Sequence, residues 1–286
     1  MSRIQSTLLA SGQTVPLARL CGWLGLPRSS AYYQPRQRCA HPLDEAMAAR
    51  IRRLHEQEPA CGVRGTWSRL RFRDGQKVNR KKVHRIMKLK GWTLPKRRAG
   101  KRPRVKITKS ITAQPDQRWA TDLAMVHCGR DGWCVFVPVL DGCTRQVLGH
   151  ALERTGRAKT AERALEEALL ARFGTLRGAP AGMLLRHDNG LVFGSRQYRA
   201  VIRDYGLTQE YITPYTPQQN GLCERFIRTF KEELCWCHRF ESIEHARLKL
   251  RAWLHHYNHH RPHQALNFRT PNQHHQLHTN PPANAA

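Results

Sequence analysis

The spacing of apolar residues changes near residue 113, and this change divides the chain into two kinds of structure. Before it, apolar residues recur at helical spacing, as in Leu17–Leu24 and Val83–Met87. After it, turn signals separate three strand-length segments, predicted as antiparallel strands over 119–126, 133–140 and 146–152. We then expect helices over 160–173, 195–205, 220–237 and 242–259, with strands over 183–187 and 208–212. Residues 113–272 are therefore predicted to form a mixed α/β layered fold.

Positive charge is concentrated before the same boundary. The chain of 286 residues carries 49 Lys and Arg against 21 Asp and Glu, a formal net charge of +28. Residues 1–110 hold 27 of the basic residues and only five of the acidic ones, a net charge of +22. Such an excess favours a polyanionic partner, and nucleic acid in particular. The most basic stretch, residues 96–112, is interpreted as an extended linker that follows a phosphate backbone rather than a merely solvated one.

Two helical segments within the basic third are candidates for DNA contact. Residues 1–40 contain a short helical pair with a turn at Gly25, which is helix-turn-helix spacing and would present Arg28 to the major groove. Residues 41–95 form a second helix-turn-helix-like domain, in which Asn79 and Gly91 are predicted to cap a basic amphipathic helix. The cations predicted to meet phosphate there are Arg80, Lys81, Lys82 and Arg85. Solvated surface helices are the alternative interpretation in both segments.

Several classes of protein are excluded by composition. No stretch approaches the roughly 18 uncharged apolar residues of a membrane span, and no secretion signal is seen. The nine cysteines are therefore expected to be reduced thiols in a cytoplasmic protein. Cys235 and Cys237 have poor spacing for structural zinc, so no metal site is predicted there. The residues from 273 to 286 are expected to be a disordered tail.

Three carboxylates in the second half of the chain are candidate metal ligands. Asp122 lies within the first predicted strand, Asp188 follows another, and Glu224 lies in the first turn of a predicted helix. Converging carboxylates suit Mg²⁺, a hard cation that prefers oxygen ligands. An ordinary Asp-Asn-Gly turn and an ordinary acidic helix start remain the alternatives for Asp188 and Glu224. Arg228 and Lys231 share a helix face with Glu224, which suits either phosphate contact or a simple ion pair.

At these residues the sequence resembles the DDE transposase and retroviral integrase superfamily. The motifs are TDLAMV around Asp122, HDNG around Asp188 and TPYTPQQNGLCERFIRTFKEE around Glu224, with 35 residues between the last two acids and Lys231 seven residues further on. The segment YNHHRPHQALNFRTP and the first-third motifs GVRGTWSRL and VNRKKVHRIMKLKGW resemble OrfB-type transposases of bacterial insertion sequences. His187 stands where many members have serine before the aspartate, and Pro27 stands where a polar cap often begins the recognition helix.

The resemblance implies an RNase H-like core in which Asp122, Asp188 and Glu224 hold two Mg²⁺ ions, with Mn²⁺ able to substitute. It implies cleavage at the ends of the element and strand transfer by the released 3′-hydroxyl, with Lys231 on a DNA phosphate. The implied partners are double-stranded DNA, further copies of the chain and the upstream OrfA product, alone or fused, in the bacterial nucleoid. A non-catalytic DNA-binding regulator and a metal-dependent nuclease are the alternatives. The complete set of acids speaks against the regulator, and the motifs do not separate the nuclease from the transferase.

Overall fold

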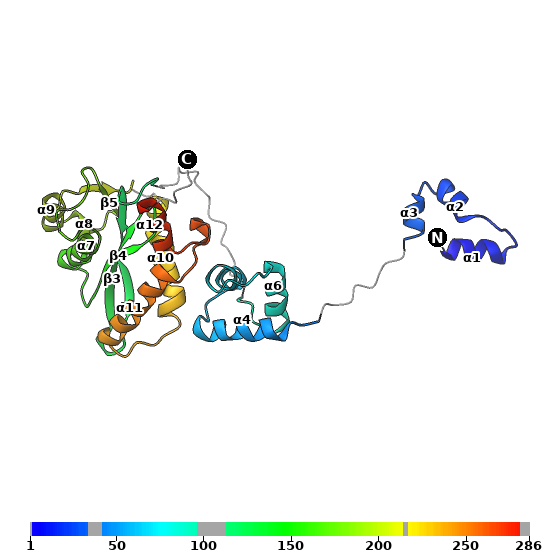
Figure 1. The fold of residues 1–286 in the computed structure, drawn as a ribbon, viewed down its shortest axis with the longest axis horizontal. Helices are drawn as coiled ribbons and strands as arrows, with labels where there is room; N and C mark the ends of the chain where they lie inside the picture. The colour runs from blue at the N-terminus through cyan, green and yellow to red at the C-terminus, as the bar shows by residue number, and fades with distance from the viewer. Residues whose placement is uncertain (1, 34–41, 96–111, 214–216, 281–286) are drawn as a thin grey trace. The chain divides into compact units, whose positions relative to one another are not determined.

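The chain divides into two compact units, Met1–Leu43 and Asp44–Ala286. The computed structural model describes residues 2–33, 42–95, 112–213 and 217–280, so most of the predicted linker, residues 96–111, lies outside the described residues. The first unit contains the helices α1 (Ser2–Ala10), α2 (Leu17–Trp23) and α3 (Arg28–Ala31) (Figure 1). Gly25, with φ +61°, forms the predicted turn between α2 and α3. Among the described residues, no helix is both long enough and apolar enough to cross a membrane.

Residues 44–95 form a small helical domain. Its helices are α4 (Glu45–Gln57), α5 (Val63–Ser68) and α6 (Arg80–Leu89), and a π-helical turn over Arg69–Arg73 follows α5. The side chain of Asn79 accepts a 2.9 Å hydrogen bond from the backbone N–H of Lys81, which confirms the predicted N-cap of α6. Its apolar stripe contains Val83, Ile86 and Met87, all 0% exposed. Leu89, at the end of the same helix, is 65% exposed. At 100° per residue it lies roughly 110° from the centre of the stripe.

A six-stranded mixed sheet forms the centre of the remaining residues. Its strands are β1 (Arg118–Thr121), β2 (Ala124–His127), β3 (Trp133–Asp141), β4 (Val147–Glu153), β5 (Leu184–His187) and β6 (Thr208–Tyr211). The strand order is β2-β3-β1-β5-β6, and β4 pairs with β3. The pairs of β3 with β1, β2 and β4 are antiparallel, whereas β1, β5 and β6 run parallel to one another. The predicted mixed α/β architecture is confirmed.

The predicted strand over 119–126 is interrupted at Asp122 and Leu123. β1 and β2 pair with β3 in one continuous register, from Thr121 opposite Val139 to Ala124 opposite Phe136. In this register the residue opposite Asp122 is Pro138, which has no backbone N–H to donate to a ladder. The N–H of Leu123 is instead bonded to the side chain of Asp122, at 2.8 Å. The prediction that Asp122 lies inside a strand was therefore wrong, because Asp122 directly follows β1.

Helices cover both faces of the sheet (Figure 1). One face is covered by α7 (Ala158–Phe173), α8 (Leu191–Gly194) and α9 (Arg196–Asp204), and the other by α10 (Gly221–Phe230) and α11 (Ile243–His259). Because side chains alternate along a strand, β3 supplies Val137 to the first core and Phe136 to the second. This double coverage explains why the sequence of β3 is almost continuously apolar.

The C-terminal segment is helical where a disordered tail was predicted. The helix α12 spans Pro271–Thr279. Thr270 and Gln273 form a capping box at its start, and Pro271 occupies the first helical turn. The prediction of disorder is thus wrong for residues 273–279, because these local signals start a helix despite its polar, histidine-rich composition.

Candidate functional site

The ends of two neighbouring parallel strands place Asp122 beside Asp188. β1 and β5 pair with Arg118 opposite Leu184 and Ala120 opposite Arg186. Continued past the strand ends, the same register places Asp122 opposite Asp188. Adjacent strands lie about 4.8 Å apart, and residues opposite each other point to the same face of a sheet. Ala120 belongs to the core beneath α10 and α11, so the even-numbered positions of this register face those helices.

The helix α10 brings Glu224 to the same face. Its buried residues Cys223 and Phe226 pack in the core that contains Ala120. Asn220, immediately before the helix, is 3% exposed and donates from Nδ2 to the backbone oxygen of Thr121 over 3.4 Å. This contact ties the start of α10 to the residue before Asp122. Asn220 was not predicted as a site residue, and only its position as a polar residue at a helix start marked it in the sequence.

The charges of the three acids act on one another. Burial, together with the negative charges of Asp188 and Glu224, raises the pKa of Asp122 to about 6, against the lowering effects of the Leu123 N–H and of Lys231. Each acid therefore lies within electrostatic reach of Asp122, as does Lys231. Their oxygens do not form a group within 4.8 Å of one another, since the one such group of ligand atoms among the described residues lies elsewhere.

The predicted cations beside the acids differ in their surroundings. Arg228 forms an ion pair with Glu232 through Nε, at 2.9 Å, so the alternative of a simple salt bridge applies to Arg228. Lys231 begins a π-helical turn, Lys231–Cys235, that continues α10. Its charge acts on Asp122, which places it on the side of the carboxylates.

The predicted DNA contacts of the basic third lie on α3 and α6. Arg28 lies on α3 in the first unit. Arg80, Lys81, Lys82 and Arg85 lie on α6. Lys82 forms a 2.6 Å ion pair with Asp44, whereas Arg80 and Lys81 are exposed in the first turn. Arg80 and Lys81 are therefore accessible to solvent at the start of α6, whereas Lys82 is already paired.

His187 is a buried core residue. It is 0% exposed, its ring stacks on Phe193 with centroids 4.8 Å apart, and Tyr211 meets it edge-on at 4.5 Å. Its Nδ1 lies 2.6 Å from the backbone oxygen of Asp188, and burial lowers its pKa, so the ring is neutral. His187 therefore supports the backbone at Asp188 through packing and one hydrogen bond.

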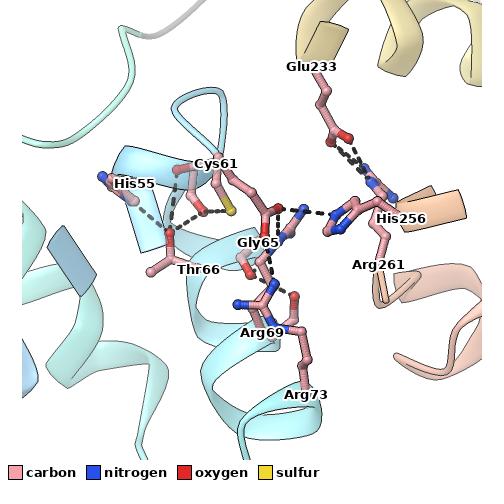
Figure 2. A network of polar contacts seen from close by, with 12 residues as sticks. His55, Cys61, Gly65, Thr66, Arg69, Arg73, Glu233, His256 and Arg261 are labelled. Atoms are coloured by element: carbon pink, nitrogen blue, oxygen red, sulfur yellow. Dashed lines mark hydrogen bonds and ion pairs between the residues drawn. The ribbon is translucent and has the colours of Figure 1, made fainter. Parts of the chain in front are cut away.

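A polar network joins the helical domain to the core (Figure 2). The carboxylate of Glu58 pairs with Arg69, with Arg73 at 2.7 Å and with His256 of α11 at 3.5 Å. Arg69 is only 4% exposed, so this is a largely buried cluster. Burial raises the pKa of Glu58, but the hydrogen bond to His256 and the charge of Arg69 outweigh it and lower the value to about 2. Glu58 was not singled out from the sequence, because its partner His256 lies in the other half of the chain.

Family models match nearly the whole described part of the second unit. The model of an integrase core domain matches residues 112–217, and a second integrase core model matches residues 205–271. A model of an HTH-like domain matches residues 42–100. The break between the HTH-like match and the integrase core matches, residues 101–111, falls close to the boundary at which the charge and the apolar spacing change.

Curated relatives come from bacterial insertion elements. The chain is 31% identical over 260 residues to the insertion element IS407 uncharacterized 31.7 kDa protein of Burkholderia multivorans, covering 89% of this chain and 88% of that protein. It is 28% identical over 244 residues to the transposase InsD for insertion element IS2A/D/F/H/I/K of Escherichia coli, covering 83% and 80%.

Solved structures with similar folds are retroviral integrases. A simian T-cell lymphotropic virus intasome in complex with PP2A regulatory subunit B56 gamma gives a TM-score of 0.47 at 16% identity, over 82% of this chain and 78% of that chain. The HTLV-2 integrase catalytic core domain in complex with magnesium gives 0.44 at 17% identity, over 57% and 98%.

Proposed function

The chain belongs to the family of insertion-element transposases that carry an integrase core, and from this premise we propose which residues perform its chemistry. The core is of the polynucleotidyl transferase type. We propose that the chain cleaves DNA at the ends of its element and joins the released 3′-hydroxyl to a target strand. Asp122, Asp188 and Glu224 are the proposed catalytic carboxylates.

The observation that carries this proposal is the shared register of Asp122 and Asp188, with Glu224 held over the same face. Burial and the charges of Asp188 and Glu224 raise the pKa of Asp122, and a cation of higher charge than Lys231 would relieve the repulsion among the three carboxylates. The donor set is oxygen only, which fits Mg²⁺ or Mn²⁺ and disfavours softer metals. When bound, two such ions would activate the attacking oxygen and stabilise the leaving one.

The protein's own groups prepare this site. Asn220 fixes the start of α10 relative to β1, so Glu224 is carried by a rigid helix rather than by a loop. The N–H of Gly190 donates to Oδ1 of Asp188, at 3.0 Å, which holds that side chain in a compact turn. Lys231 supplies positive charge on the same side and is proposed to hold a phosphate oxygen of the DNA.

DNA recognition is proposed to lie in the basic third. The helix-turn-helix-like domain would contact the ends of the element through Arg80, Lys81, Lys82 and Arg85, and the first unit through Arg28. We propose that further copies of the chain assemble on the DNA and that the OrfA product joins it, as partner or fusion, in the bacterial cytoplasm at the nucleoid.

A nuclease that cuts without joining is the second candidate, because it would use the same carboxylates. The regulator is not favoured, because the relatives include transposases.

The test is an assay of cleavage and joining on DNA that carries the element's ends. We expect Asp122→Asn, Asp188→Asn or Glu224→Gln each to lower both reactions by at least about a thousandfold while leaving binding to the ends nearly unchanged. Glu210→Gln is the matched control, since Glu210 pairs with Arg118 and Arg186 in the same sheet without belonging to the cluster. Normal joining by Asp122→Asn would reject the site, and cleavage without joining by the parent protein would favour the nuclease.

A further inference from the structure

A cluster of one thiol and two imidazoles lies outside the carboxylate site. Cys143 follows β3, and His274 and His278 lie one turn apart on α12. One ligand atom from each of the three lies within 4.8 Å of the others. We propose that this cluster binds a single Zn²⁺ ion, which fastens α12 to the turn between β3 and β4.

The spacing of the ligand atoms fits tetrahedral zinc. Sγ of Cys143 lies 3.7 Å from Nε2 of His278. With Zn–S near 2.3 Å and Zn–N near 2.0–2.1 Å, a tetrahedral ion separates such a pair by about 3.6 Å. Two histidines four residues apart share one face of a helix, so α12 presents both rings in one direction. Thiolate and imidazole are ligands that zinc prefers and magnesium does not.

The ring of His278 is already oriented for this role. Its Nδ1 lies 3.2 Å from Oε1 of Gln114, an oxygen that can only accept a hydrogen bond. Nδ1 is therefore the protonated nitrogen, and the lone pair of Nε2 points toward Cys143. Zinc-bound histidines in proteins usually donate their other N–H to an oxygen in this way. His274 offers a second ring whose Nδ1 is buried and has no hydrogen-bond partner among the described residues.

The other side of the cluster is equally fixed. The carboxylate of Asp141 is 0% exposed and accepts from the N–H of Cys143 at 3.0 Å, from the N–H of Thr144 at 2.6 Å and from its hydroxyl at 2.9 Å. These bonds hold the tight turn that carries the thiol. Cys143 is 8% exposed, which protects the thiol, and the cluster borders a cavity of about 800 Å³ that leaves room for water as a fourth ligand.

Binding requires a change of protonation at Cys143. Burial and the charges of Asp141 and Asp116 raise the pKa of this thiol to about 11, so it is protonated at neutral pH. The ion would displace that proton and form a metal–thiolate bond, releasing one H⁺ per ion bound. The same negative charges that raise the pKa favour a divalent cation at this place.

Cobalt is the probe that separates this cluster from the carboxylates. The full chain would be stripped of metal with a chelator under reducing conditions and titrated with Co²⁺, a spectroscopic substitute for zinc. Thiolate coordination gives a charge-transfer absorption that carboxylate ligands cannot produce. We expect one equivalent with this absorption in the parent protein. It should be absent in Cys143→Ser and should need at least about ten times more cobalt in His278→Gln.

Matched controls are available on the same elements. Cys237→Ser removes an exposed thiol, and His275→Gln removes the histidine adjacent to His274 on α12, so both should bind cobalt as the parent does. Zn²⁺ should also slow backbone amide exchange in α12 of the parent protein but not of His278→Gln, a partly accessible position whose change leaves the core intact. Absence of the absorption from the parent protein, or its persistence in Cys143→Ser, would overturn the proposal.

Discussion

The helical domain of residues 44–95 and the integrase core use positive charge in opposite ways. In the core, arginines join separate elements through acids: Arg118 of β1 and Arg186 of β5 share Glu210 of β6, and Arg163 and Arg247 share Glu153. In the helical domain one acid, Glu58, forms ion pairs with both Arg69 and Arg73. Arg80 and Lys81, exposed in the first turn of α6, have no ion pair among the residues described there.

This difference separates structural from recognition charge. A cation that already has a carboxylate partner contributes little net attraction for a polyanion, whereas a cation without one retains its full charge for phosphate. The formal net charge of +28 counts every cation equally, whether or not it is paired. The paired arginines of the core should therefore attract DNA less than their number suggests, and the difference in DNA attraction between the core and the helical domain should be larger than their charges alone indicate. Substitutions that remove equal charge from the two regions can test this distinction.

The largest expected effect is on Glu58. We expect Glu58→Gln to lower the free energy of unfolding by about 3 kcal/mol, because it leaves Arg69 buried without its counter-charge. Because the pKa of Glu58 is about 2, below its unfolded value, this stabilisation is present at neutral pH. It should be lost progressively as the pH falls from about 4.5 toward 2. Denaturant unfolding at several pH values measures both effects.

Glu153→Gln is the control in the core. Glu153 also pairs with two arginines, but Arg163 is 69% exposed, so the cost should stay below about 1 kcal/mol. Equal losses for the two variants would show that burial does not distinguish the two networks.

A smaller effect is expected on DNA affinity. Arg80→Gln with Lys81→Gln should weaken binding to the element's ends about tenfold and reduce the slope of log affinity against log salt by about 1.8, or 0.9 per contact. The control, Arg154→Gln with Arg163→Gln, removes the same charge from the core, where both side chains are paired and 69% exposed. Binding titrations over a range of salt concentrations would compare the two. Equal slopes would mean that overall charge, not position, governs affinity.

The smallest expected effect is a gain of stability at Asp122. Its pKa of about 6 exceeds the unfolded value near 3.9, so the folded chain binds more protons between these values. The ionised carboxylate of Asp122 therefore destabilises the metal-free protein at pH 7. Near pH 4 the carboxyl is protonated in the folded protein, and this destabilisation disappears. Asp122→Asn should stabilise the chelated protein by about 1–2 kcal/mol at pH 7 and by little at pH 4.5, measured by denaturant unfolding. A loss of stability at pH 7 would show that the charge is already compensated.

The architecture was largely predictable because its signals are local. Turn glycines and apolar spacing marked the strands, and Asn79 marked the start of α6. The break after Thr121 was missed because it depends on Pro138 of another strand. By contrast, the helix α12 was missed although its capping signal, Thr270 with Gln273, is local. The polar, histidine-rich composition of the segment favoured the prediction of disorder instead.

The sequence marks the proposed site as a set of residues but does not give its geometry. Spacing marked Asp122, Asp188 and Glu224, yet the pairing of β1 with β5, which brings Asp122 and Asp188 to the same end of two neighbouring strands, is encoded by no local signal. The same limit hid the cluster at Cys143, since its ligands are more than 130 residues apart. Sequence patterns instead drew attention to Cys235 and Cys237, whose thiols belong to no such group of ligand atoms among the described residues.

The π-helical turn Lys231–Cys235 changes the phase of the helix that carries Glu224. Up to Lys231 the helix is regular, and seven residues are nearly two full turns, so Lys231 stays aligned with Glu224. A π-helical turn acts as one inserted residue, which rotates everything after it. Glu233 thereby meets Arg261 at 2.8 Å, and Leu234 enters the core. The part of the helix before the turn aligns Lys231 with Glu224, and the part after it directs Glu233 toward Arg261 and Leu234 into the core. Deletion of one residue from this turn would keep Lys231 aligned with Glu224 but would rotate Glu233 and Leu234 away from their partners.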